Sequence, residues 1–271
     1  MMAAAAEKIS VILLINILSR IPSDFVSLYR QFMAGKGIAM MLLVALIIIA
    51  IVLFVIVFVI VLQDGQRKVA VQYSQKIQGR KTKGGQSTHI PIRVNTAGVV
   101  PVIFASSLMQ LPIIVASFIG KGNGDGIGAE ILKGLNSNNW CNPNNIVYSW
   151  GLILYILLTI VFAYFYTSIT FNPMELANNL KKNGGFVPGI RPGKPTVDYL
   201  TRILNYIIFI GAVGLIIVQV IPFIFNGVFG ASVSFGGTSI IIIVGVVLEI
   251  IKQIESQMLV RNYKGFLNSG K

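Results

Sequence analysis

Charged residues are scarce in this chain of 271 residues, and acidic ones are scarcer still. Asp, Glu, Lys and Arg make up 11 % of the sequence, whereas a typical soluble domain carries about 25 %. Only 9 residues are acidic against 22 Lys and Arg, a formal net charge of +13, and 55 % of the chain is hydrophobic. This composition argues against an ordinary soluble enzyme and favours a basic membrane protein whose charges lie outside long apolar segments.

Cysteine and histidine are almost absent. Cys141 and His89 are the only residues of their types, which excludes an internal disulfide and a His/Cys metal cluster. The sequence also shows no paired carboxylates and no nucleophile placed with a base. We therefore expect no enzymatic activity, no metal and no cofactor.

Long uncharged intervals dominate what is present. Asp, Glu, Lys and Arg are all missing from residues 37–63, 94–120, 134–174 and 203–248. About 20 apolar residues in a helix cross a bilayer core about 30 Å thick, and a helix bonds every backbone group internally, as lipid requires. We predict six transmembrane helices, at residues 9–21, 38–63, 97–118, 146–170, 199–225 and 238–258.

Basic residues are distributed unevenly among the connecting segments. Seven Lys or Arg lie in 64–94, five in 171–202 and four after the apolar part of the last helix, against five on the opposite side. Positive residues concentrate on the cytoplasmic side of a membrane, so both termini are predicted to be cytoplasmic. The outer segment 119–145, rich in Gly and Asn, is predicted to be a flexible solvated loop.

Alternating apolar residues in the cytoplasmic segment 64–94 predict two short strands. Val69, Val71 and Tyr73 alternate with polar or small residues, and so do Ile90 and Ile92. This period-two pattern around a Gly-Gly turn is typical of a β-hairpin, here with a basic tip. A hairpin of this length favours contact with an acidic partner over a loop that serves topology alone.

A second cytoplasmic segment is predicted to be stiff. Asn172 is placed to cap a short helix that ends at Gly184-Gly185. Residues 187–195 then carry three prolines, which restrict the backbone. Such a loop holds Arg191 and Lys194 outward at little entropic cost on binding, so we predict a binding role.

Apart from Arg202 near the start of the fifth predicted helix, the charged residues within the long spans are Glu249, Lys252 and Glu255, in the cytoplasmic half of the last helix. Glu249 and Lys252 are spaced to pair on one helix face. An ion-coupled transporter usually keeps such residues near the bilayer midplane, so this pattern argues against one. Small polar residues in the third helix either pack helices together or line a movable wall.

Several stretches of the sequence resemble bacterial SecY, the central subunit of the Sec protein-conducting channel. They are residues 71–73 (VQY), 84–95 (GGQSTHIPIRVN), 97–107 (AGVVPVIFASS), 172–173 (NP) with 177–182 (ANNLKK), 186–193 (FVPGIRPG) and 235–239 (FGGTS). The resemblance covers residues 9–266 and implies the C-terminal half of that fold, the fifth to the tenth of ten helices. It implies an all-α membrane protein with a small cytoplasmic β-hairpin.

The predicted organisation is an atypical lead at residues 1–8, the SecY-like half at 9–266 with cytoplasmic loops 64–94 and 171–198, and a cytoplasmic tail at 259–271. A lone half cannot enclose the family's pore. Whether the chain is a piece of a longer protein, one half of a split protein or a reduced relative stays open.

The resemblance also implies roles for individual residues. A pore ring of apolar side chains would comprise Ile9, Leu13, Ile103 and Ile242. The lateral gate would be lined by Ser106, Ser107 and Gln110. The contact with a motor or the ribosome would comprise Arg191, Lys194, Lys76, Arg80, Lys81 and Lys83.

The function implied is a subunit of the Sec channel in the bacterial inner membrane, which passes or laterally releases unfolded preproteins. The implied partners are SecE, SecG, the motor ATPase SecA, the ribosome, preprotein signal sequences, membrane lipid and a chain that supplies the first four helices. Two alternatives stay open: a non-channel insertase or scaffold, and a secondary transporter of small solutes.

Overall fold

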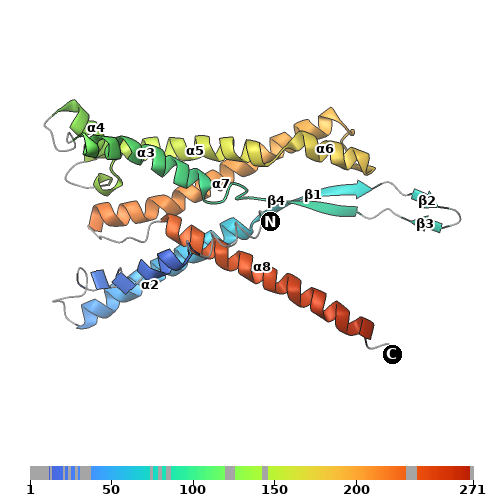
Figure 1. Ribbon diagram of the computed structural model, residues 1–271, viewed down its shortest axis with the longest axis horizontal. Helices are drawn as coiled ribbons and strands as arrows, with labels where there is room; N and C mark the ends of the chain where they lie inside the picture. Colours follow the sequence, from blue (N-terminus) through green and yellow to red (C-terminus); the bar gives the residue numbers. More distant parts are fainter. Residues whose placement is uncertain are drawn as a thin grey trace. The chain divides into compact units, whose positions relative to one another are not determined.

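The computed structural model describes residues 12, 14–20, 22–23, 26–27, 30, 38–73, 76–78, 81–83, 87–119, 126–141, 146–229 and 237–268. The helices are α2 (Ile38–Asp64), α3 (Val100–Phe118), α4 (Ile127–Leu135), α5 (Trp150–Thr170), α6 (Pro173–Lys182), α7 (Lys194–Phe229) and α8 (Gly237–Asn268), with 3-10 turns η2 (Ser137–Asn139) and η3 (Ile146–Ser149) (Figure 1). The strands are β1 (Gln66–Tyr73), β2 (Lys76–Gln78), β3 (Lys81–Lys83), β4 (Ser87–Arg93) and β5 (Gly185–Phe186). The chain forms two compact units, Val61–Ile217 and Met1–Ile60 with Val218–Lys271.

Five helices in the described part of the chain are long and apolar enough to cross a membrane, namely α2, α3, α5, α7 and α8. They correspond to five of the six predicted spans. Of the remaining predicted helix, 9–21, the structure describes Ile12 and residues 14–20, and these are helical.

Two helices extend beyond their predicted ends. α7 begins at Lys194 rather than at residue 199, and α8 continues to Asn268, through most of the segment predicted as a tail. A drop in hydropathy along the sequence indicates where a helix leaves the lipid, not where the helix ends. A helix that has already formed extends at little cost, because each added residue gains a backbone hydrogen bond. The extension of α7 contains Thr196, which is buried and whose hydroxyl donates a hydrogen bond to the Arg191 carbonyl oxygen.

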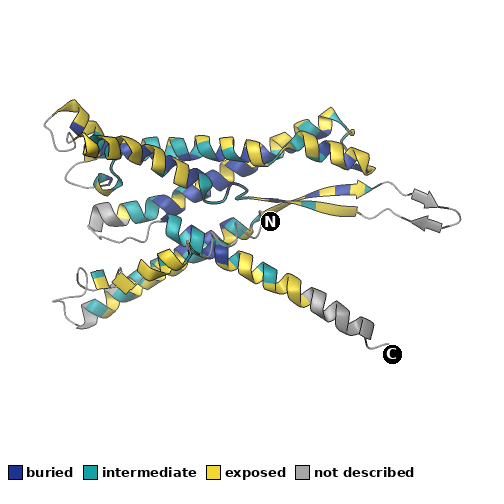
Figure 2. Ribbon diagram, viewed as in Figure 1, coloured by how far each residue is buried: buried dark blue, intermediate teal, exposed yellow. Residues whose placement is uncertain are grey.

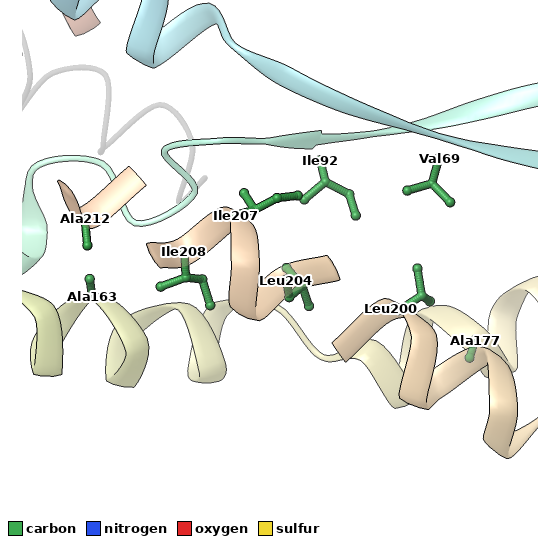
Figure 3. Close-up of a cluster of buried hydrophobic side chains, with 9 residues drawn as sticks. All are labelled: Val69, Ile92, Ala163, Ala177, Leu200, Leu204, Ile207, Ile208 and Ala212. Carbon is green, nitrogen blue, oxygen red and sulfur yellow. The ribbon is translucent and has the colours of Figure 1, made fainter. Parts of the chain in front are cut away.

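The core of the unit Val61–Ile217 lies where the sheet meets α7 (Figure 3). Val69 of β1 and Ile92 of β4 pack with Leu200 and Leu204 of α7. The same cluster includes Ala163 of α5, Ala177 of α6, and Ile207, Ile208 and Ala212 of α7. Each fully buried Val, Leu or Ile contributes about 1.5–3 kcal/mol, so this cluster fixes the sheet to the membrane helices.

The hairpin predicted in 64–94 is present, but its turn lies elsewhere. β1 and β4 pair antiparallel from Gln66 opposite Arg93 to Gln72 opposite Ser87. Beyond them β2 pairs with β3, with Gln78 opposite Lys81. The chain therefore reverses between Gln78 and Lys81, not at Gly84-Gly85. Strand pairing extends beyond the residues that alternate between apolar and polar. That alternation is confined to β1 and β4, the part of the hairpin that packs on α7.

The segment 119–145 is not simply a solvated loop, because residues 127–135 form α4 and Trp140 is only 2 % exposed. The Trp140 indole Nε1 donates a hydrogen bond to the Gly134 carbonyl oxygen at 2.7 Å. Glycine lowers helix propensity, so Gly128 and Gly134 argued against a helix in the sequence. Tertiary contacts override that preference here, since the Trp150 ring occupies the space beside Gly134.

The capped helix predicted after the fourth span is confirmed as α6. The Asn172 side-chain oxygen accepts hydrogen bonds from the backbone N–H groups of Met174 (3.1 Å) and Glu175 (3.3 Å). The chain leaves the helix at Asn183 and Gly184, as expected, but Gly185 belongs to β5.

Candidate functional site

The two predicted cytoplasmic projections form one structure. β5 pairs antiparallel with the end of β1, with Gln72 opposite Phe186 and Tyr73 opposite Gly185, giving a sheet of order β4-β1-β5. We call this sheet and the adjoining loop 187–193 the cationic platform. The sequence did not predict this connection, because β5 is only two residues long and carries no periodic pattern.

Opposite faces of the platform have different roles. Val69, Val71 and Ile92 are buried on the side that faces the helices. The intervening positions are exposed, so the cations at those positions lie in solvent. The exposed cations of the platform and the adjoining parts of α6 and α7 are Arg67, Lys68, Arg93, Lys181, Lys182, Arg191, Lys194 and Arg202, against the exposed acids Asp64, Glu175 and Asp198. This excess of positive charge favours an anionic partner.

The loop that carries Arg191 is held by hydrogen bonds at both ends. Ile190 N–H donates to the Val187 carbonyl at 3.0 Å, and the hydroxyl of buried Thr196 donates to the Arg191 carbonyl at 2.9 Å. Gly189 (φ 80°) and Gly193 (φ 107°) adopt the left-handed conformation that glycine tolerates. The backbone of Arg191 is thus fixed while its side chain is exposed, as the prolines predicted. The sequence alone did not indicate this role of Thr196, which lies at the start of α7.

The basic tip of the hairpin contains the short strands β2 and β3. Lys76 lies in β2 and Lys81 and Lys83 in β3, so three of the predicted contact residues have a defined backbone position. Arg80 lies outside the described residues.

One face of α3 carries the residues assigned to the lateral gate. Pro101, Val102, Ala105 and Met109 are buried, and α3 packs against α5 (Figure 2), where Phe104 stacks on Phe162 with ring centroids 5.8 Å apart. Spacings of three, four and seven residues place Ile103, Ser106, Ser107 and Gln110 together on another face. Of these, Ile103, Ser107 and Gln110 are exposed.

The hydroxyl of Ser106 is turned back onto its own helix. It donates to the Ile103 carbonyl at 3.0 Å, so Ser107 and Gln110 provide the free polar groups of this face. An exposed amide and hydroxyl give α3 a mildly polar stripe within an apolar span.

Two of the residues predicted to form the pore ring, Ile103 and Ile242, belong to different compact units. Ile242 is half-buried on α8, in the unit Met1–Ile60 with Val218–Lys271, whereas Ile103 belongs to the other unit. Ile9 and Leu13 lie outside the described residues. The structure therefore groups the gate residues with Ile103 and groups Arg191 with Lys194, and it leaves the ring untested.

Gly185→Val is expected to detach β5 from β1. A Cβ at Gly185 would lie 2.9 Å from Cε1 of Tyr73, so the ring must move and the pairing with Tyr73 weakens. Hydrogen exchange at residues 72–73 and 185–187 should accelerate about tenfold, equivalent to about 1.4 kcal/mol. Asn183→Val, at a nearby exposed position, is the control and should leave exchange unchanged. Equal exchange in both variants would contradict this account of the platform.

Comparison with known proteins identifies the family. The SecY family matches residues 6–251. The chain belongs to the SecY family. Protein translocase subunit SecY of Streptomyces galbus is 47 % identical over 208 residues, which cover 76 % of this chain and 45 % of that protein. The SecY subunit of Mycobacterium bovis is 41 % identical over 268 residues, covering 95 % of this chain and 57 % of that protein.

The chain spans about half the length of the curated SecY relatives it matches, and the matched stretch is their C-terminal part. The fold is also similar to solved structures. One, described as showing that the plug domain of SecY stabilizes the closed state of the translocation channel, has a TM-score of 0.54 at 16 % identity, with 92 % of this chain and 59 % of that chain covered. Another, of a protein conducting channel, has a TM-score of 0.51 at 17 % identity. Family and apolar helices together establish an integral membrane protein with the SecY fold.

Proposed function

We propose that this chain forms one wall of the Sec protein-conducting channel and transmits the push of a cytoplasmic partner to it. The observation that carries the proposal is the connection between the cationic platform and α7. Val69 and Ile92 of the sheet pack on Leu200 and Leu204, and α7 continues from there into the membrane. A partner bound at Arg191 is thus coupled through a packed core to a membrane helix.

The channel wall acts without chemistry of its own. Ile103 and Ile242, with Ile9 and Leu13, contribute bulky aliphatic side chains to a pore ring. Such a ring offers a passing polypeptide no hydrogen bonds and opposes ion flow by dewetting. Energy for movement comes from the partner, and the wall lowers only the resistance to passage.

The polar stripe of α3 forms part of the lateral gate. Ser106, Ser107 and Gln110 face a movable neighbour or a signal sequence rather than lipid, because exposed polar groups in hydrocarbon are costly. A signal sequence displaces this neighbour and reaches the lipid beside α3. Unfolded preproteins therefore either cross the membrane or leave the channel sideways.

The partners follow from the charges and from the family. SecA or the ribosome docks on the exposed cations Arg191 and Lys194 and on the tip residues Lys76, Arg80, Lys81 and Lys83. SecE, SecG and a chain supplying the first four helices complete the channel. The complex lies in the bacterial inner membrane with both termini of this chain in the cytoplasm.

Site-specific crosslinking tests this function. A photoreactive residue replaces Ile103 or Ile242 in membranes that hold the complete complex, and a secretory protein is stalled during export. We expect its mature part to crosslink at both positions and not at Ile153, an exposed position of α5. Crosslinks of signal or membrane segments at Ile103 alone would instead favour a non-channel insertase. Saturable uptake of a small solute by vesicles holding the chain would favour a transporter.

A further inference from the structure

The end of the unit Val61–Ile217 opposite the cationic platform carries a built cap rather than a loop. We call residues 126–141 and 146–151 the outer cap; α4 there contacts α3, η3 and α5 (Figure 1). Trp140 donates its indole hydrogen bond to Gly134 and lies 5.5 Å from the Tyr155 ring. The Cys141 backbone N–H donates to the Ser149 hydroxyl at 3.3 Å. These contacts fix α4 on the ends of two membrane spans.

The outer cap exposes large apolar side chains that its own packing does not require. Ile127 of α4 is 81 % exposed and Val147 of η3 is 80 % exposed. Ile131 lies one helical turn from Ile127 and is also exposed, whereas the charged Lys133 lies on another side of α4 and Glu130 lies at the border between the two sides. α4 is therefore amphipathic, with its apolar side directed away from the protein.

This apolar surface continues the lipid-facing surface of a membrane span. On α3, Ile114 and Val115 are exposed within the span, and Phe118 at its end is 88 % exposed. α4 contacts that same helix. Trp150, which is 39 % exposed, opens α5 at this level, and tryptophan is enriched where lipid meets water. This continuity identifies the occupant of the surface as lipid.

We propose that the outer cap is a membrane-interface anchor. The apolar side of α4 enters the boundary between headgroups and acyl chains, and Glu130 and Lys133 face water, as in other interfacial helices. The anchor holds the outer ends of α3 and α5 at one depth. This inference needs only that α3 and α5 span the bilayer, so it stands even if the channel function fails.

Intrinsic fluorescence tests the anchor directly, because Trp140 and Trp150 are the chain's only tryptophans. The full-length W140F variant, reconstituted in phosphatidylcholine vesicles, reports Trp150 alone, and W150F reports Trp140, which is 2 % exposed. Bromines about 5–10 Å below the headgroups should remove about half of the Trp150 emission. They should remove little of the Trp140 emission.

Two results would overturn the proposal. Quenching of Trp150 by aqueous iodide, with none by bromine, would place the cap in water. Quenching by neither would mean that another protein surface covers the cap.

A second pair of variants keeps the test decisive if W140F fails to fold. In a Cys141→Ser background, Ile127→Cys or Lys133→Cys is labelled with a polarity-sensitive fluorophore. We expect bromine quenching and blue-shifted emission at position 127, and iodide quenching at position 133. Equal iodide quenching at both positions would refute an interfacial helix.

Discussion

Arg191→Glu is expected to weaken docking of the cytoplasmic partner about tenfold or more, equivalent to at least about 1.4 kcal/mol. Arg191 is exposed on a loop whose backbone is held by Thr196 and by the turn at Val187. A fixed cation needs little ordering on binding, and reversal of its charge replaces attraction by repulsion. Co-sedimentation of the membrane complex with SecA or with ribosomes, over a series of salt concentrations, measures the effect.

A matched control separates position from net charge. Lys182→Glu makes the same change of charge at an exposed position in the last turn of α6. We expect it to alter binding less than Arg191→Glu does. Unchanged docking of the Arg191 variant at moderate salt would contradict the assignment. Equal losses in both variants would mean that the partner senses only the total charge.

Gly151→Ala is expected to be the most destabilising small substitution in the unit Val61–Ile217. A Cβ on Gly151 would overlap the Gly134 carbonyl oxygen and crowd the Trp140 ring. Backbone atoms cannot rotate away as a side chain can, so α4 must separate from α5. Overpacking of this kind costs about 1–3 kcal/mol and occasionally more. The melting temperature in detergent, followed by size-exclusion chromatography, should fall accordingly.

The control for this prediction is the same substitution elsewhere in the cap. Gly128 is exposed on α4, and a Cβ there would meet no atom within 4 Å. Gly128→Ala should be neutral or should stabilise by about 0.4–1 kcal/mol, because alanine restricts the unfolded chain. Similar melting temperatures for both variants would refute the close contact between α4 and α5.

The sequence alone determined where five of the membrane helices lie. Uncharged intervals such as 37–63 and 203–248 must be helical in lipid whatever their neighbours are. The cap of α6 was equally predictable, because Asn172 acts on N–H groups two and three residues away. Local hydrogen bonding and solvent preference need no knowledge of the rest of the fold.

Only the tertiary structure decided how the predicted pieces combine. The pairing of Gly185 with Tyr73 joins two loops more than 100 residues apart in the sequence, and no pattern in a two-residue strand announces its partner. The helix α4 likewise depends on Trp140 and Trp150 packing around Gly134, since its glycines disfavour a helix in isolation. Hydropathy and periodicity indicate whether a segment, or one face of it, lies in water or in an apolar environment. Strand pairing and side-chain fit are set by segments distant in sequence, and these contacts built the platform and the outer cap.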